Sequence, residues 1–200
     1  MILWDMNSDH RTLTGVLSGD RGDQLEGALV HAGANPVKAR AVLRAAGADP
    51  LELRLVKGGK RAPETGRQMI SDILLHGITE ILSARGKALA MRLGGAEDDF
   101  WPCRFDTNPD EAFFLVLPNR TFDIVDAEQS TFLNFVPTEP PVPAEIGTLR
   151  FNRPPHDLPP LFRTRIPKTK LFFCGLLVRD DFKAAWEQEK FTGAAFRRLC

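Results

Sequence analysis

The sequence predicts an α+β fold, with a mixed or antiparallel sheet and flanking helices. One order of elements, an apolar strand, a capped helix and an aromatic strand, occurs twice, in residues 78–105 and 171–199. Between them, residues 113–117 form a continuous apolar run, which is typical of a strand covered on both faces. A chain of 200 residues, 43% hydrophobic and 26% charged, can bury a sizeable core. We therefore expect two strand-helix-strand units that follow a helical N-terminal lead-in.

The chain is expected to divide near residue 66. Residues 58–66 form a polar, glycine-containing loop, which is the most plausible internal boundary. The sequence therefore predicts a helical lead-in plus a strand at 1–66, packed on an α+β domain at 67–200. A chain of this length does not require two separate domains.

The lead-in contains one well-marked helix. Asn35 and Pro36 predict its start, because the Asn side chain can accept backbone N–H groups and proline suits the first helical turn. Gly47 predicts its end. A shorter helix is expected at 23–32, and residues 51–55 alternate leucine with charged side chains, as in a half-buried strand.

The two strand-helix-strand units are expected to form a degenerate repeat. Placing Leu82 against Val178 also aligns Lys87 with Lys183. The expected strand, helix and strand lie at 78–82, 84–93 and 100–105, and again at 171–178, 180–190 and 193–199. Ser83 is the expected cap of the first helix, and Pro102 predicts an edge strand or a bulge. The repeat predicts the same local topology for both units.

The segment between the units contains many prolines. Residues 137–160 hold eight of the chain's 15 prolines, so we expect an extended loop with at most a short strand. Such a segment can dock into an aromatic-lined groove, although a spacer between sheet edges is more common. Residues 122–125 and 146–151 are further strand candidates.

Charge is distributed unevenly although the formal net charge is zero. Residues 97–146 carry 11 acidic and two basic side chains, a net charge of −9, whereas residues 147–200 carry a net charge of +6. The acidic segment either faces a positively charged partner or is a solvated surface balanced by its basic neighbour. A net charge of zero argues against direct binding of nucleic acid.

Known catalytic and metal-binding patterns are missing from the sequence. The four histidines stand far apart, no C-x-x-C pair occurs among the three cysteines, and no G-x-S-x-G elbow is present. Gly58–Lys60 lacks the spacing of a phosphate loop. Asp123, Asp126 and Glu128 could gather around a divalent cation, but a polar strand end is the stronger interpretation. We therefore expect a binding protein that is not an enzyme and needs no metal or cofactor.

The sequence also predicts a cytoplasmic protein without a membrane span. No apolar run approaches the 18 to 20 residues, roughly, that a membrane-spanning helix needs. Residues 1–5 lack the basic start and apolar stretch of a signal peptide. Three widely spaced cysteines, odd in number, are expected to be reduced thiols.

Diffuse motifs occur along the last hundred residues. They include a D-x-E-x-S turn at Asp126–Ser130 and a terminal T-G-x-x-F at Thr192–Phe196. The other segments are 113–119, 160–163 and 177–186, with 81–85 and 101–102 upstream. Together they resemble a family of immunity proteins from bacterial polymorphic toxin systems, over residues 67–200. Arg179 stands where that family tends to show a serine cap, and Asp180 can supply the cap instead.

This resemblance implies an α+β protein that binds and neutralises a cognate secreted toxin by occlusion, without catalysis. The alternatives are a structural or adaptor subunit of a secretion or phage-related assembly, and an enzyme of an unrecognised kind. Many toxins that act on nucleic acids or nucleotides have basic clefts, which an acidic surface would complement. We therefore expect a basic, nuclease-like or nucleotide-targeting toxin domain as partner. The candidate contacts are acidic: Asp98, Asp99, Asp106, Asp110, Glu111, Asp123, Asp126 and Glu128.

Overall fold

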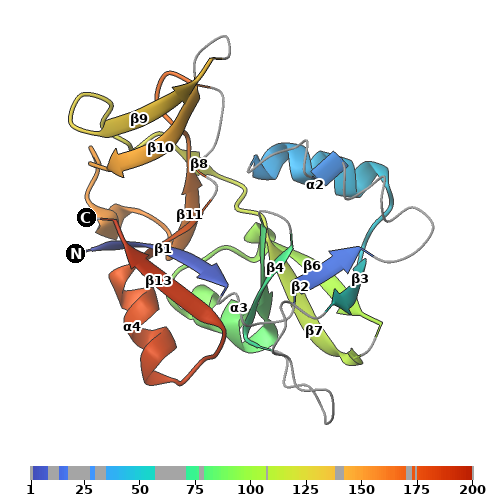
Figure 1. The fold of residues 1–200 in the computed structure, drawn as a ribbon. Coiled ribbons are helices and arrows are strands. Elements are labelled where there is room, and N and C mark those ends of the chain that lie inside the picture. The colour runs from blue at the N-terminus through green and yellow to red at the C-terminus, as the bar shows by residue number, and fades with distance from the viewer. Residues whose placement is uncertain are drawn as a thin grey trace.

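The fold is α+β, as the sequence predicts, and it contains two main sheets (Figure 1). The computed structural model describes residues 2–8, 14–17, 28–29, 35–56, 71–76, 79–106, 108–137, 142–169, 173 and 175–199. The helix predicted at 23–32 falls mostly outside the described residues, and the loop predicted at 58–66 falls wholly outside them.

The first sheet has six strands in the order β2-β3-β6-β7-β5-β4. Their bounds are Thr14–Leu17, Leu51–Val56, Phe100–Phe105, Asn108–Val116, Thr79–Ser83 and Ile73–His76, in that order. On the interior strand β7, Phe113 and Leu115 enter one core cluster, whereas Val116 and Phe114 contact another. Coverage of this strand on both faces is therefore confirmed.

The proline in β6 is tolerated because of where the neighbouring strand pairs. Strand β6 lies between β3 and β7, so it is not an edge strand along its whole length. Strand β3 pairs only with Cys103 to Phe105. Pro102, which has no N–H to donate, therefore lies beyond this ladder, and a register shift follows between Cys103 and Phe105.

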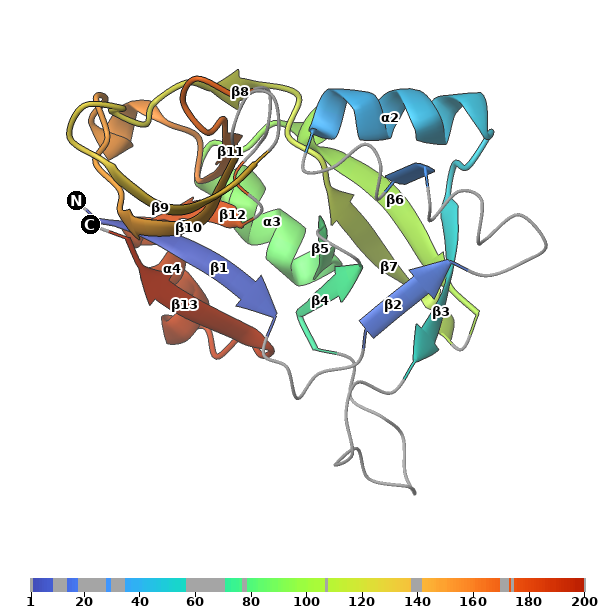
Figure 2. The same cartoon turned by 45° about the horizontal axis from the view of Figure 1, so that its top comes forward.

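The second sheet has the order β13-β1-β12-β11-β8. Their bounds are Ala194–Arg198, Leu3–Ser8, Leu176–Arg179, Leu161–Thr164 and Thr121–Phe122, in that order. Strand β1, which the helical lead-in did not include, pairs with β12 on one side and β13 on the other. The two termini consequently lie side by side (Figures 1 and 2), and the Leu199 N–H donates to the Leu3 carbonyl oxygen at 3.1 Å.

The proline-rich segment contains a longer strand than expected. Strand β10, Val142–Thr148, pairs antiparallel with β9, Thr131–Val136, and the two form a separate ribbon. The expectation of at most a short strand was therefore wrong. A two-stranded ribbon leaves one side of each strand unpaired, so Pro143 can occupy β10 without removing a hydrogen bond from a sheet interior.

The helices begin where the sequence places their caps. Helix α2, Pro36–Ala45, starts with the Asn35 side chain accepting two backbone N–H groups. Helix α3, Ala84–Arg92, starts with Ser83, whose hydroxyl accepts the Gly86 N–H at 3.2 Å. Helix α4, Asp180–Gln188, has Arg179 at its N-cap. In the part of the chain that the structure describes, the helices lack the length and apolar character of a membrane span.

Both strand-helix-strand units have the same topology, so the predicted repeat is confirmed. In the first unit, β7 lies between β5 and β6 and runs antiparallel to both. In the second unit, β1 lies between β12 and β13 in the same way. Each helix therefore connects two parallel strands that are separated by a strand from elsewhere in the chain.

A constant offset relates the residues of the two units. Helix α3 begins at Ala84 and α4 at Asp180, an offset of 96 residues. Phe114 is paired with Leu82, and Trp4 is paired with Val178, at equivalent positions of the central strands. The Lys87 ammonium lies 4.1 Å from the Phe114 ring centroid, and the Lys183 ammonium lies 4.5 Å from that of Trp4. The repeat thus extends to individual side-chain contacts.

Three core clusters hold these layers together. Helix α2 covers one cluster on the outer face of the first sheet (Figure 2), and residues around β8, β11 and β12 form another. The central cluster joins both sheets to α3 and α4. Trp186 is 2% exposed there, and a Cβ on Gly86 of α3 would lie 3.4 Å from its ring. The small residue on α3 therefore leaves room for the large one on α4.

Candidate functional site

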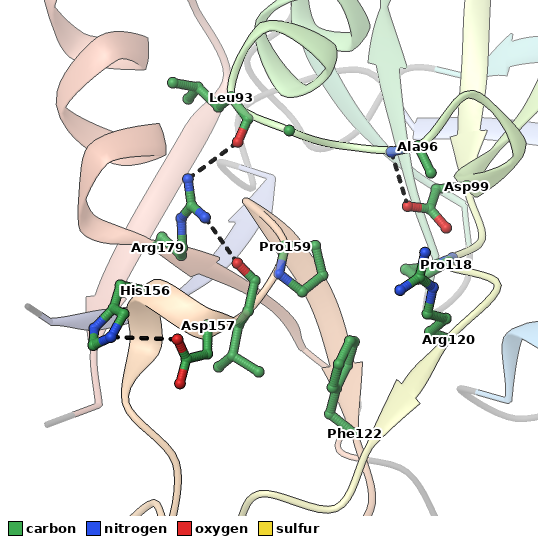
Figure 3. A pocket seen from close by; sticks show the side chains of 12 residues that line it. Leu93, Ala96, Asp99, Pro118, Arg120, Phe122, His156, Asp157, Pro159 and Arg179 are labelled. Carbon is green, nitrogen blue, oxygen red and sulfur yellow. Dashed lines mark hydrogen bonds and ion pairs between the residues drawn. The ribbon is translucent and has the colours of Figure 1, made fainter.

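A pocket of about 290 Å³ lies where the two units meet (Figure 3). Residues from both units and from the chain between them line it: Leu93, Gly94, Ala96, Asp99, Pro118, Arg120, Phe122, His156, Asp157, Leu158, Pro159 and Arg179. The pocket therefore depends on how the whole molecule is assembled. Its volume is near the lower end of the range, about 300 to 1,000 Å³, that is usual for ligand sites.

Arg179 joins the two units at one wall of the pocket. Its guanidinium donates to the Leu93 carbonyl oxygen at 3.1 Å and to the Leu158 carbonyl oxygen at 2.8 Å (Figure 3). It also forms a bidentate ion pair with the Asp181 carboxylate, at 3.0 and 2.6 Å. Most of its donors are therefore engaged within the protein, which fixes the guanidinium as a structural clamp.

The expected substitute cap at the start of α4 is wrong. The Asp180 carboxylate accepts from the Trp4 indole N–H at 2.8 Å instead of from the helix. Asp181 accepts the Phe182 N–H at 2.9 Å while it binds Arg179. The Asp181 carboxylate in the first turn thus accepts a backbone N–H of the helix and also orients the Arg179 clamp.

Asp99 forms the opposite wall and is a structural residue. It ends the short 3-10 helix η1, Glu97–Asp99, and is only 6% exposed. Its carboxylate accepts the Asn119 N–H at 2.8 Å and the Ala96 N–H at 3.4 Å. Arg40 of α2 supports the same wall by donating to the carbonyl oxygens of Asp98 and Leu117.

The remaining polar side chains of the pocket differ in how far they are engaged. His156 and Asp157, in the 3-10 helix η2, Pro155–Asp157, are exposed, and the imidazole lies 3.3 Å from the carboxylate. Arg120 is also exposed, and its guanidinium has no hydrogen-bond or ion-pair partner among the described residues. Arg120 is therefore the cation of the pocket that is open to a partner.

The eight acidic candidates do not form one surface. Asp99 lines the pocket and Asp98 precedes it, and Asn119 donates to both carboxylates. Asp106, Asp110 and Glu111 lie at the β6–β7 hairpin and are exposed. Arg54 lies 3.4 Å from the Asp106 carboxylate.

The third acidic group follows β8, at the opposite end of the molecule from that hairpin (Figure 1). Asp123 is exposed and lies 3.7 Å from Arg165, and Glu128 is also exposed. The Asp126 carboxylate accepts the N–H groups of Glu128 and Gln129 at 2.9 and 3.1 Å. Asp126 is therefore a turn residue, and the acidic segment presents at least two separate exposed groups.

Among the side chains that line the pocket, those able to act as nucleophiles or metal ligands are two carboxylates and one imidazole. None of its twelve lining residues is Ser, Thr, Cys, Lys or Tyr, the usual nucleophiles other than carboxylates and His. Within the described ranges, no three His, Cys, Asp or Glu side chains are grouped as a metal site requires. Cys103 is 4% exposed, and burial raises the pKa of its thiol to about 12.

Three pocket residues were not singled out as site residues from the sequence: Arg120, His156 and Arg179. They stand in different elements, 23 or more positions apart, so no local motif joins them. The available signal was Arg179 itself, an arginine at the position where the family that the chain resembles tends to show a serine cap. A long donor at a helix start can reach a neighbouring element, whereas a serine hydroxyl cannot.

Comparison with known proteins adds no assignment. No family of known proteins matches the chain, and no curated protein matches its sequence. Evidence for a function therefore comes from the residues, their geometry and the resemblance described above.

Proposed function

We propose that this chain is an immunity protein that binds a secreted bacterial toxin and neutralises it by occlusion, without catalysis. The observation that carries the proposal is the resemblance over residues 67–200. The pocket supports it, because its lining combines the fixed Arg179 clamp, the Arg120 guanidinium, which has no partner among the described residues, and apolar side chains. Such a surface suits recognition of another protein.

The motifs behind the resemblance have structural roles in this chain. In the D-x-E-x-S turn, Asp126 caps the turn, and Ser130 Oγ accepts the Arg150 N–H at 2.9 Å. In the T-G-x-x-F motif, the Thr192 N–H donates to Asp72 at 3.0 Å, and Gly193 has a φ of +85°. Because these residues have structural roles, the resemblance indicates a shared architecture. The exposed surface of the immunity protein, which would contact the toxin, can therefore differ from one toxin partner to the next.

The partner we propose is a basic toxin domain, of the nuclease-like or nucleotide-targeting kind, met in the cytoplasm. The exposed carboxylates of the acidic segment support this charge, because complementary charge speeds encounter and excludes other partners. Asp123 and Glu128 belong to the exposed group that follows Phe122 of the pocket lining. This group is the one we expect to meet the toxin.

Co-expression tests the proposal directly. We expect growth of cells that produce the toxin encoded beside this gene to be rescued by this protein, and the purified pair to form a complex. A complex with a neighbouring structural subunit, and none with a toxin, would contradict the proposal and favour the adaptor alternative. Rescue without a complex, accompanied by a covalent change in the toxin, would contradict it in favour of an enzyme.

A further inference from the structure

Strand β13 is an edge strand, and the ladder shows which of its backbone groups point outward. Among the described strands it pairs with β1 alone, and Figure 2 shows it at the border of the sheet. The Leu199 N–H donates to the Leu3 carbonyl oxygen, so this residue pair is one that exchanges hydrogen bonds. Such pairs alternate with outward-directed pairs in an antiparallel ladder. Ala194, Phe196 and Arg198 therefore direct their N–H and C=O groups away from β1.

The first unit contains the same edge in a closed form. The offset of 96 residues that relates α3 to α4 also relates β6 to β13, so Phe100 is equivalent to Phe196. Pro102 is equivalent to Arg198 in the same way. The Phe100 N–H donates to the Glu97 carbonyl oxygen, and Pro102 has no N–H. Neither outward position of β6 therefore offers a donor to a further strand.

In the second unit, the edge is not closed in this way. The Phe196 N–H has no acceptor among the described residues, and at Arg198 the backbone keeps the N–H that a proline lacks. No described strand lies beyond β13 in the sheet order. Natural proteins usually block such edges, because an open edge pairs with a strand of another chain. The sheet can therefore be extended at β13.

The side chains of β13 are complementary to a second copy of the same strand. Antiparallel pairing about Phe196 places Arg197 opposite Ala195 of the other copy. It also places Arg198 opposite Ala194. Each large side chain therefore faces a small one, the two Phe196 rings meet at the centre, and no arginine lies directly opposite another. Aromatic pairs stabilise such a ladder, whereas directly opposed like charges destabilise it.

The charges of β13 favour a second copy over a strand of the basic toxin. The Arg197 guanidinium lies 2.7 Å from the buried Asp5 carboxylate, which neutralises it. The two Arg198 side chains would stand four residues apart along the paired strands, about 13 Å, which exceeds the screening length of about 8 Å. A basic toxin strand would bring positive charge without a neutralising carboxylate. A second copy brings its own Asp5 with each Arg197.

We infer that two copies of this protein associate through β13, in antiparallel pairing about Phe196, and join their five-stranded sheets into one continuous sheet. Only the five residues of β13 from each copy form the ladder. Stable interfaces bury roughly 1,200 to 2,000 Å², so this smaller contact gives a weak, reversible dimer that forms at concentrations on the order of 100 μM. The inference does not depend on the identity of the toxin.

Sedimentation equilibrium of the full chain tests the association. We expect a reversible change from monomer to dimer between about 10 μM and about 1 mM. Arg198→Pro copies Pro102 of the first unit and removes an outward N–H, so it should weaken the dimer by about tenfold or more. Arg198→Ala loses the same side chain and keeps the N–H, so it should associate as the wild type does. Circular dichroism checks that both variants are folded.

A second pair of variants keeps the test independent of how Arg198→Pro folds. Ala195→Arg, at an exposed position, places a like charge opposite Arg197 of the other copy. Two such pairs form in each dimer, so association should weaken by about fivefold or more. Ala41→Arg, at an exposed alanine of α2, is the control and should leave it unchanged. A wild type that stays monomeric at the highest concentration, or a dimer that neither β13 variant weakens, would overturn the inference.

Amide signals of the isotope-labelled full chain locate the contact. As the protein is concentrated, the signals of Phe196 and Arg198 should shift progressively, and those of Ala195 and Arg197, which face β1, should shift much less. Shifts confined to another edge, such as the β9–β10 ribbon, would overturn the inference. A Phe196 signal that is independent of concentration and shifts only when the neighbouring toxin is added would assign the edge to the toxin, and would overturn it as well.

Discussion

At the scale of single residues, large side chains and buried charges at the centre determine how the two units fit together. Trp186 stacks on Phe191 with ring centroids 4.6 Å apart, and it lies beside Phe182 at 5.9 Å. A second central contact is the ion pair between Glu80 of β5 and Arg163 of β11, at 2.6 Å, with both side chains 1% exposed. These residues connect elements that are far apart in the sequence.

Truncation of Trp186 to alanine should destabilise the fold strongly. We expect the free energy of unfolding to fall by about 3 to 5 kcal/mol, because removal of a buried ring leaves a cavity that α3 and α4 cannot fill. Val37→Ala, at a side chain that is 56% exposed, is the control and should change it by less than about 0.5 kcal/mol. Urea titration measures both, and a loss under about 1 kcal/mol for Trp186→Ala would contradict its place in the core.

Glu80 should make stability depend on pH. Burial raises the pKa of the Glu80 carboxyl from 4.5 to about 7, although Arg163 opposes this shift. Between these two values the folded state binds more protons than the unfolded state, so stability falls as pH rises, by about 3 kcal/mol in total. We expect urea titrations to show this fall between pH 5 and pH 8 in the wild type, and a smaller fall in Glu80→Gln. A wild type that gains stability over this range relative to Glu80→Gln would contradict the shift.

At the scale of elements, the contact between the two units at Asp72 and Thr192 is held differently from the pocket. The carboxylate at Asp72 is 11% exposed, whereas the pocket is bordered by Asp157, which is 53% exposed. The Arg179 clamp spans the pocket wall from Leu93 to Leu158. The contact at Asp72 is therefore held by a buried carboxylate, whereas an exposed carboxylate borders the pocket.

Removal of each carboxylate should show this difference. We expect Asp72→Ala to lower the free energy of unfolding by about 2 to 3 kcal/mol, because Ser83 and Thr192 lose their acceptor in a buried setting. Asp157→Ala should cost at most about 1 kcal/mol, since it removes only an exposed ion pair. Thermal unfolding of the two variants compares them, and equal losses would contradict the distinction between a buried and an exposed carboxylate.

Helices and strands that depend on residues close together in the chain could be predicted from the sequence. Asn35 and Ser83 marked helix starts because a cap acts within four residues, and the aligned Leu82 and Val178 predicted the repeat. Strand β1 was missed because its partners lie 170 or more residues away. Most of β10 was missed because the segment around it is rich in proline, although β10 itself holds one proline, Pro143, in a two-stranded ribbon that leaves one side unpaired. Pairing over such distances leaves no local pattern.

The candidate site was less predictable than the fold. Charge alone could not separate Asp99 and Asp126, which accept backbone N–H groups, from Asp123 and Glu128, which are exposed. The residues that line the pocket come from 93–99, 118–122, 156–159 and Arg179, and they come together only in the folded chain.

At the scale of the whole molecule, the acidic segment is spread over different ends of the fold (Figure 1). The hairpin group at Asp110 and Glu111 lies far from β8, whereas Asp123 and Glu128 follow it. A toxin seated over the pocket would meet the second group first. The two groups are therefore matched controls for each other.

Charge reversal should distinguish the acidic group after β8 from the acidic group at the β6–β7 hairpin. We expect Asp123→Lys with Glu128→Lys to slow association with the toxin by about tenfold at low salt and to weaken its salt dependence, because steering by exposed charges is screened over about 8 Å at physiological ionic strength. Asp110→Lys with Glu111→Lys should change the rate little. Asp126 is left intact because it caps a turn. Stopped-flow binding measures both rates, and a larger effect from the hairpin pair would move the contact away from the pocket.

We propose that this protein neutralises the toxin by binding to it and occluding its site of action. It is tested most directly by titrating the activity of a fixed amount of the neighbouring toxin with this protein, at concentrations well above the dissociation constant. Occlusion predicts a linear fall in activity that ends at one protein molecule per toxin molecule, with full recovery of activity when the complex is dissociated. Complete inactivation at a small fraction of that ratio, or activity that does not return on dissociation, would contradict the account.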